Sequence, residues 1–349
     1  MSSRKYVGLD VHKATMTAAV RDGRGKLIST SVFQTSAEAL REFLAGLSGH
    51  LHLTFEEGTH AACLLELCSP LVDTLVVCNP RQHHQPRTKS KSDRIDAENL
   101  SLWLFQGRLT SVYHHLHDTA RLKQFVRSYD ALVRDRTRVK NRLKALYRAR
   151  AIACSGRAVY DPTRGLAFVE RLPDGQRQRA SRLLRQLEAL RPLVVEAQLE
   201  LRREVRTHAA YPLLRSLPGF GPVRVAQTIA AIVTPHRFGC DRQLWSYAGL
   251  SVVTHTSSDF EVRDGELQRR RQKVATRGLV RSCNRQLKEV FKGAAQTAIA
   301  RPPFQARYER MLERGLAAPI ARVEVARRLA SLVLKLWKTG EAFDANRVS

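Results

Sequence analysis

The chain has 349 residues, 43% of them hydrophobic, and Lys plus Arg number 59 against 32 Asp plus Glu, a formal net charge of +27. That size suffices for two or three domains with cores of their own, and so large a positive charge repels itself unless it meets a polyanion, which makes nucleic acid the expected partner. No apolar run is long enough for a membrane span or a signal peptide, and the six cysteines form no CxxC pair, so we expect an intracellular protein with reduced thiols.

The first 115 residues alternate strand and helix signals. Alternating apolar residues predict strands over 5–11, 15–21 and 26–33, with a hairpin turn at Asp22-Gly23. Helical spacing predicts a helix over 36–48. Further strand and helix signals follow at 51–55, 60–69 and 75–78. Three antiparallel strands followed by alternating helices and strands indicate a ribonuclease H-like α/β domain over 1–115.

Acidic residues mark the ends of these predicted elements. Asp10 ends the first strand and Glu56 ends the fourth, where side chains from distant parts of the sequence converge above a sheet. A helix predicted over 93–105 places Asp93 and Asp96 on one face, about a turn apart. Carboxylates are the ligands that Mg²⁺ or Mn²⁺ prefers, so these residues are candidate metal ligands. The alternative is that Asp93 caps the helix and Asp96 is a solvated acid in its first turn.

The sequence of residues 116–206 indicates a basic, α-helical coiled-coil region. Residues 121–150 are dense in Lys and Arg, while apolar residues recur at three- and four-residue steps, which predicts a long amphipathic helix with a basic outer face. A heptad rhythm over 183–201 predicts a second helix, either antiparallel to the first or dimerising, with a kink or break at Pro192. The basic face is either merely solvated or tracks phosphates. The candidate nucleic-acid contacts on it are Arg134, Arg138 and Arg142.

The sequence of residues 207–345 indicates a mainly α-helical C-terminal domain. The glycine-rich turn at 217–223 has the form of a helix-hairpin-helix turn, in which Gly219 and Gly221 would let backbone N–H groups approach a phosphate. A glycine-rich turn between two packed helices would look the same. Residues 254–259 read as an ordinary loop. The chain then becomes basic again before its last helices, and the candidate nucleic-acid contacts there are Arg269, Arg270 and Arg271.

Segments at both ends of the chain resemble one known family. Residues 7–13, 55–59, 77–80 and 91–97 are similar to the N-terminal, junction-resolvase-like domain of the DEDD-motif insertion-sequence transposases, which are bridge-RNA-guided serine recombinases. Residues 217–222, 247–250 and the segment around Ser257 resemble that family's C-terminal transposase domain. The segments occur in the family's order, so the resemblance extends over nearly the whole chain.

The resemblance implies roles for individual residues. Asp10, Glu56, Asp93 and Asp96 occupy the family's four acidic positions and would bind Mg²⁺ or Mn²⁺, with Glu57 as an alternative to Glu56. In the C-terminal domain the family carries a nucleophilic serine about eight positions beyond the glycine of a Gly-Leu pair. Counting from Gly249 reaches Ser257, with Ser258 as the alternative.

The resemblance also implies an activity and partners. It implies a DNA transposase that cleaves and exchanges strands with metal assistance and a serine nucleophile, at a site shared by two chains of a homodimer or homotetramer. A structured guide RNA would accompany the DNA, in the cytoplasm and associated with the nucleoid of a prokaryotic-type cell. Two other interpretations remain open at this point. One is a two-metal hydrolytic nuclease of the junction-resolvase type, and the other is a non-catalytic nucleic-acid-binding scaffold.

Overall fold

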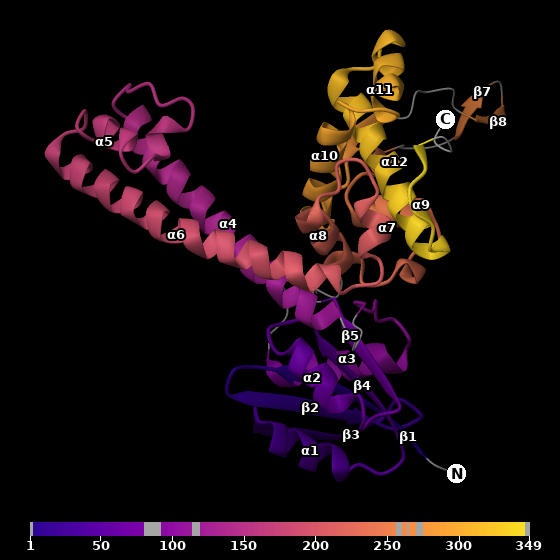
Figure 1. The fold of residues 1–349 in the computed structure, drawn as a ribbon. Helices are drawn as coiled ribbons and strands as arrows, with labels where there is room; N and C mark the ends of the chain where they lie inside the picture. Colours follow the sequence, from indigo (N-terminus) through magenta and orange to yellow (C-terminus); the bar gives the residue numbers. More distant parts are fainter. Residues whose placement is uncertain are drawn as a thin grey trace. The chain divides into compact units, whose positions relative to one another are not determined.

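The computed structural model divides the chain into two compact units, residues 1–117 and 118–349 (Figure 1). The residues that it describes are 3–79, 92–113, 119–255, 260–263, 265–269 and 275–345. The further boundary that we predicted after residue 206 lies within the second unit and stays a prediction. Among the described residues, none of the helices is both long and apolar enough to span a membrane.

The N-terminal unit is built on a mixed sheet of five strands in the order β3-β2-β1-β4-β5. The strands are β1 (Arg4–Val11), β2 (Thr15–Arg21), β3 (Leu27–Gln34), β4 (His50–Glu56) and β5 (Thr74–Cys78). The first three pair antiparallel, whereas β4 runs parallel to β1 and β5 runs parallel to β4. The α/β class predicted for this part of the chain is confirmed.

Helices cover both faces of this sheet. Val7, Leu9 and Phe55 point to the face that packs on α1 (Ala37–Ala45) and α2 (Ala61–Cys68). Because side chains alternate along a strand, the neighbouring positions point to the opposite face, which α3 (Asp93–Phe105) covers. There the Tyr6 ring stacks on His52 and meets Phe105 of α3 edge to face.

The second unit begins with a long helical hairpin. Helix α4 (Thr119–Arg148) and helix α6 (Asp174–Arg206) lie side by side, and η1 (Ala158–Tyr160) and α5 (Arg164–Val169) close the end of the hairpin that they share (Figure 1). A hydrophobic cluster of its own fills this end, which we call the hairpin tip.

The break that we considered at Pro192 is wrong, because α6 continues through it. Proline removes one backbone hydrogen bond from a helix. Pro192 lies on the exposed side of α6, where water can satisfy the carbonyl that loses its donor, while the buried Leu187 and Val194 hold the helix against its neighbours on the other side.

The rest of the second unit is a helical bundle around one core, and the prediction of a helical C-terminal region is confirmed. The bundle contains α7 (Tyr211–Arg215), α8 (Pro222–Ile232), η2 (Pro235–Arg237), α9 (Asp241–Tyr247), α10 (Arg285–Ala298), α11 (Phe304–Glu313) and α12 (Ala318–Thr339). The sequence analysis missed four short strands that follow α9. They are β6 (Val252–His255), β7 (Phe260–Arg263), β8 (Glu266–Arg269) and β9 (Ala275–Leu279).

The bundle and the hairpin share buried contacts. Leu122 of α4 and Leu201 of α6 belong to the core of the bundle. Next to them, the buried carboxylate of Asp130 accepts a hydrogen bond from Gln227 of α8, at 2.7 Å, and another from Gln286 of α10. Burial raises the pKa of Asp130, and the two amide donors partly offset that effect because they stabilise the carboxylate. This carboxylate therefore links three helices.

The core of the hairpin tip yields the first prediction. Tyr147 is fully buried there, burial raises its pKa to about 12, and no described residue forms a hydrogen bond with its hydroxyl group. A buried polar group without a partner costs about 1–3 kcal/mol. Tyr147→Phe should therefore raise the free energy of unfolding by about 1 kcal/mol in a urea titration.

The control for this variant is Tyr147→Ala, which also removes the ring and should destabilise the protein by about 3–5 kcal/mol. A clear loss of stability in Tyr147→Phe would mean that the hydroxyl group does have a partner and that this account of the core is wrong.

Candidate metal centre and nucleic-acid contacts

The candidate site is organised by one face of β1. Gly8 and Asp10 lie two positions apart and point toward α3, and His12 follows just beyond the end of the strand at Val11. A Cβ atom added to Gly8 would overlap the backbone nitrogen of Ser101 and the carbonyl oxygen of Ala97. The backbone of α3 therefore lies directly on β1, and Asp10, at the next position on this face, lies beside the N-terminal turn of α3.

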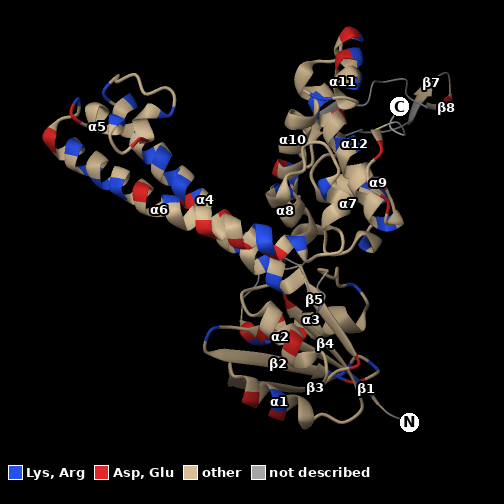
Figure 2. Cartoon of the chain, viewed as in Figure 1, with Lys and Arg blue, Asp and Glu red and all other residues tan. Residues whose placement is uncertain are grey.

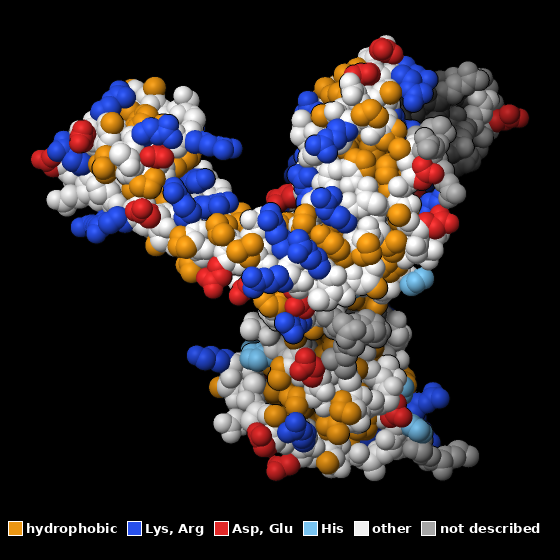
Figure 3. All heavy atoms as spheres, in the orientation of Figure 1, with side chains coloured by type: hydrophobic (Ala, Val, Ile, Leu, Met, Phe, Trp, Pro, Cys, Tyr) orange, Lys and Arg blue, Asp and Glu red, His pale blue; other side chains and the backbone are white. Residues whose placement is uncertain are grey.

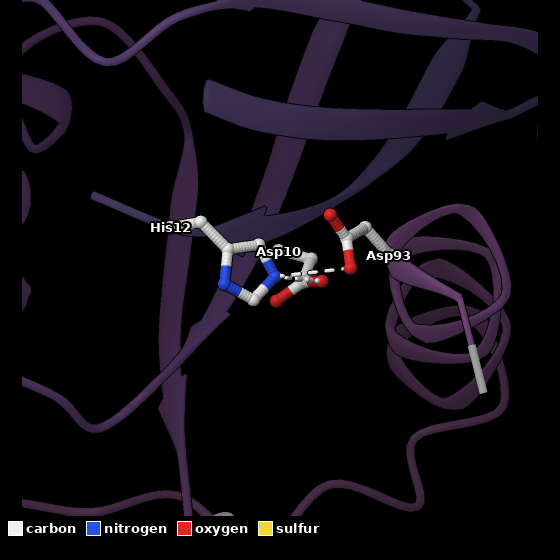
Figure 4. Close-up of side chains that lie close together, drawn as sticks. All are labelled: Asp10, His12 and Asp93. Atoms are coloured by element: carbon white, nitrogen blue, oxygen red, sulfur yellow. Dashed lines mark hydrogen bonds and ion pairs between the residues drawn. The ribbon is translucent and has the colours of Figure 1, made fainter. Parts of the chain in front are cut away.

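Three side chains meet at this point (Figure 4). Ligand atoms of Asp10, His12 and Asp93 all lie within 4.8 Å of one another. The Nε2 atom of His12 is 3.0 Å from Asp10 Oδ2 and 3.3 Å from Asp93 Oδ1. The side chain of Asp10 is only 16% exposed, whereas those of His12 and Asp93 are 48% and 56% exposed. The cluster thus has a buried base and an open side.

The electrostatics of the cluster favour a cation. Burial is the largest cause of the raised pKa of Asp10, His12 lowers it, and the nearby Asp96 and Asp93 raise it further. A bound cation between these carboxylates would offset both the burial of the Asp10 charge and its repulsion by Asp93 and Asp96. Carboxylate oxygens suit Mg²⁺ or Mn²⁺, and imidazole nitrogen is a common ligand of transition-metal ions, so this set of donors fits a divalent metal.

The N-terminus of α3 places two of the predicted acids. Ser92, not Asp93, caps the helix, because its hydroxyl oxygen accepts a hydrogen bond from the backbone N–H of Ile95 at 3.3 Å. The alternative in which Asp93 is the cap is therefore wrong. Asp93 and Asp96 both lie in the first turn of α3, where the helix dipole favours negative charge.

The third predicted acid, Glu56, lies on the strand next to Asp10. Leu9 pairs with Phe55, so Asp10 and Glu56 follow one position later and point to the same face of the sheet. Glu56 is not among the three clustered residues. Its carboxylate contributes to the raised pKa of Cys78, about 11, although burial is the larger cause. Glu57 lies beyond the end of β4, and its backbone N–H donates to the Cys78 carbonyl at 2.9 Å.

Sequence reasoning did not assign a role to His12. The available signal was its position two residues after Asp10, just beyond the end of β1 at Val11. Two hydrogen bonds hold the turn that follows: the His12 backbone N–H donates to the Thr15 carbonyl at 3.0 Å, and the Thr35 hydroxyl donates to the His12 carbonyl at 2.9 Å. The imidazole is therefore carried by a defined turn.

The residues predicted to contact nucleic acid differ in whether the structure describes them. Arg134, Arg138 and Arg142 are exposed on α4, and Arg138 forms an ion pair with Asp135 at 2.9 Å. Figure 2 shows further Lys and Arg residues along α4 and α6. Five predicted positions lie outside the described residues or have side chains outside them: Ser257, Ser258, Arg269, Arg270 and Arg271.

The glycines of the predicted helix-hairpin-helix turn differ from each other. Gly219 has a φ of +84°, and a Cβ atom there would overlap the Ala294 carbonyl oxygen of α10. Arg224 also donates a hydrogen bond to the Gly219 carbonyl at 2.6 Å. Packing against α10 therefore explains Gly219. Gly221 caps α8 with open space around its Cα atom. A phosphate contact at either glycine stays a prediction.

Comparison with known proteins identifies the class and then the family. A model of DEDD-type IS110 elements, described as "Transposase", matches residues 7–149, which include all four predicted acids. A second model, described as "Transposase IS116/IS110/IS902 family", matches residues 211–309, which include Ser257. Both models are of IS110-type insertion-sequence transposases, and the chain belongs to the IS110 family.

One curated relative also matches the chain. It is an insertion element IS116 uncharacterized 44.8 kDa protein from Streptomyces clavuligerus, 28% identical over 162 residues. The alignment covers 46% of this chain but only 37% of the relative.

The contact between β1 and α3 yields the second prediction. Gly8→Ala should push α3 away from β1, lower the free energy of unfolding by about 1–3 kcal/mol and weaken Mn²⁺ binding to the full-length protein. Chemical unfolding and isothermal titration calorimetry measure the two effects.

Gly23→Ala is the matched control, because the added Cβ atom would lie 3.8 Å from the Arg4 carbonyl oxygen, an ordinary contact. This variant should resemble the parent in both measurements. A Gly8→Ala protein with parental stability and Mn²⁺ affinity would show that α3 does not depend on this contact.

Proposed function

We propose that this chain catalyses metal-assisted, serine-mediated cleavage and exchange of DNA strands in the transposition of an insertion sequence. The observation that carries the proposal is the meeting of Asp10, His12 and Asp93 at the end of β1, in a member of a transposase family. The strand order β3-β2-β1-β4-β5 supports a ribonuclease H-like, junction-resolvase-type N-terminal domain.

The acidic residues form the proposed metal centre. Asp10, Glu56, Asp93 and Asp96 would hold Mg²⁺ or Mn²⁺, with His12 beside them. Metal bound there would neutralise charge on a DNA phosphate and make a nearby hydroxyl group more acidic. The alternation of side chains supports Glu56 rather than Glu57, because Glu56 shares the α3 face with Asp10. The half-buried Asp10 fixes the base of the site, and the exposed Asp93 faces the side that DNA would enter.

Ser257 is the proposed nucleophile. Its Oγ atom would form a bond with the scissile phosphorus as the bond from phosphorus to one deoxyribose oxygen breaks, and that oxygen would leave as a free hydroxyl group. Attack by a hydroxyl group of another strand would then restore a phosphodiester and release the serine. The energy of the broken bond is kept in the phosphoserine ester. A serine hydroxyl is a weak nucleophile, so this step requires activation.

Because the two motifs lie in separate units, either one chain folds back on itself or two chains share a site, and the family resemblance favours the second arrangement. The acids lie in the unit 1–117 and Ser257 lies in the unit 118–349. We propose that two chains of a homodimer or homotetramer share a composite site, with the α4 and α6 hairpin as a coiled-coil element and the turn at Gly219 and Gly221 as a helix-hairpin-helix-like DNA contact. The net charge of +27 supports a nucleic-acid partner, and the family resemblance implies a structured guide RNA in addition to DNA.

Replacing a metal ligand tests the metal centre. Asp10→Ala should abolish strand cleavage in Mg²⁺ and leave DNA affinity within about twofold, because the cations that attract DNA lie elsewhere in the chain. Glu38→Ala removes one exposed negative charge on α1, on the opposite face of the sheet, and should cleave like the parent. Cleavage at the parental rate by the Asp10→Ala protein would remove the metal-site assignment.

Trapping of a covalent protein–DNA adduct tests the serine. Ser257→Ala should prevent both cleavage and the adduct that denaturing gels resolve on labelled DNA, because no hydroxyl group remains to attack phosphorus. Ser258→Ala should retain a measurable share of both. An adduct in the Ser257→Ala protein would move the nucleophile to Ser258, and metal-dependent cleavage without any adduct would favour the hydrolytic nuclease.

A further inference from the structure

Two lysines lie against one tyrosine ring at the hairpin tip, and further cations lie close enough to act on one of them. The Nζ atoms of Lys140 and Lys144, one turn apart on α4, lie 4.8 Å and 5.4 Å from the centre of the Tyr160 ring. Three more cations act on Lys140 from two other segments and from α4 itself. These are Arg136 of α4, Arg157 next to η1, and Arg191 of α6. We call the five cationic residues, Arg136, Lys140, Lys144, Arg157 and Arg191, the tip cluster.

The tip cluster lacks acidic partners among the described residues. The ion pairs near it join other residues: Arg138 with Asp135, Arg164 with Asp161, and Arg177 with Asp174. The attraction of a cation to an aromatic ring is only about 0.5–1 kcal/mol at exposed sites, so Tyr160 offsets little of the repulsion among five charges. Burial, followed by those four cations, lowers the pKa of Lys140. The fold therefore holds repelling charges together at a cost in stability.

The position of the tip cluster also favours a ligand. Figure 3 shows Lys and Arg side chains gathered on the surface of the hairpin near α5, away from the core of the bundle. From Arg136 to Lys144 the helix rises about 12 Å, which is similar to the width of a DNA major groove. Cations spaced in this way suit phosphates on both borders of one groove.

We propose that the tip cluster binds the phosphate backbone of double-stranded DNA without reading its sequence. Proteins that bind single strands offer aromatic rings on which bases stack, whereas two ammonium groups lie against the Tyr160 ring. The cluster presents charge alone, which fixes position rather than sequence. The choice of DNA as the partner rests on the proposed function, whereas the affinity of the cluster for phosphate rests on the charges alone.

The test compares two double variants of the full-length protein. Lys140→Gln/Lys144→Gln removes two charges from the tip cluster. Arg310→Gln/Arg314→Gln removes two exposed charges from and beside α11. Fluorescence anisotropy measures binding of a labelled duplex DNA of arbitrary sequence over a range of KCl concentrations. A duplex RNA of equal length forms a second arm.

We expect the tip variant to bind DNA about tenfold more weakly at low salt, with a slope of log K against log salt that is reduced by about 1.8, the release of counterions from two phosphates. The α11 variant should keep most of the parental slope. Because repulsion is relieved, the tip variant should also unfold at the same temperature as the parent or a higher one.

Three results would overturn the proposal. One is a tip variant whose titration overlays that of the parent, and another is an equal loss in both variants, which would mean that only total charge matters. The third is a loss confined to the RNA arm, which would assign the cluster to RNA. The serine mechanism is tested separately, by the covalent adduct that the parent protein forms on labelled DNA. Absence of that adduct from the parent itself would overturn the mechanism and leave the binding result intact.

Discussion

The candidate metal centre depends on the direct contact between the backbones of α3 and β1 at Gly8. A side chain at this position would overlap the backbone of α3 at Ala97 and Ser101. Arg21 of β2 fastens the same helix, since it donates to the Ser101 hydroxyl at 3.1 Å and to the Glu98 carbonyl at 3.3 Å. Asp10, Asp93 and Asp96 are therefore carried by a strand and a helix whose separation is fixed by backbone atoms, and this gives the proposed metal site the rigid support that such sites need.

The N-terminal strands and the long helices could be predicted from the sequence, because apolar residues recur in each of them at the strand or helix period over several residues. Asp10 and Asp93 could be selected from their places at the ends of predicted elements. His12 could not, because its contact with Asp93 depends on where α3 lies, which no local pattern states. The strands β6 to β9 were missed for a different reason. They have four or five residues each, too few to establish a period, and three of them, β7, β8 and β9, contain charged residues.

In the second unit, burial divides the hairpin into a fixed base and a separate tip. At the base, Leu122 and Leu201 join the core of the bundle, and Asp130 receives hydrogen bonds from Gln227 and Gln286. A buried carboxylate is costly unless its oxygens are satisfied, so the two glutamines make this joint specific as well as tight. The tip has its own hydrophobic cluster and concentrates cations instead. The hairpin therefore holds charge at a defined distance from the bundle.

The two units have opposite electrostatic requirements. In the N-terminal unit, burial and then the nearby Asp96 and Asp93 raise the pKa of Asp10, and without a cation these acids would repel a phosphate. At the hairpin tip, cations crowd around Lys140 and attract phosphate without any metal. DNA affinity can thus come from residues that take no part in the chemistry, whereas approach of a phosphate to Asp10 requires that the acids first be neutralised. The proposed DNA binding and strand cleavage should therefore respond to different variables, binding to salt and cleavage to the divalent metal.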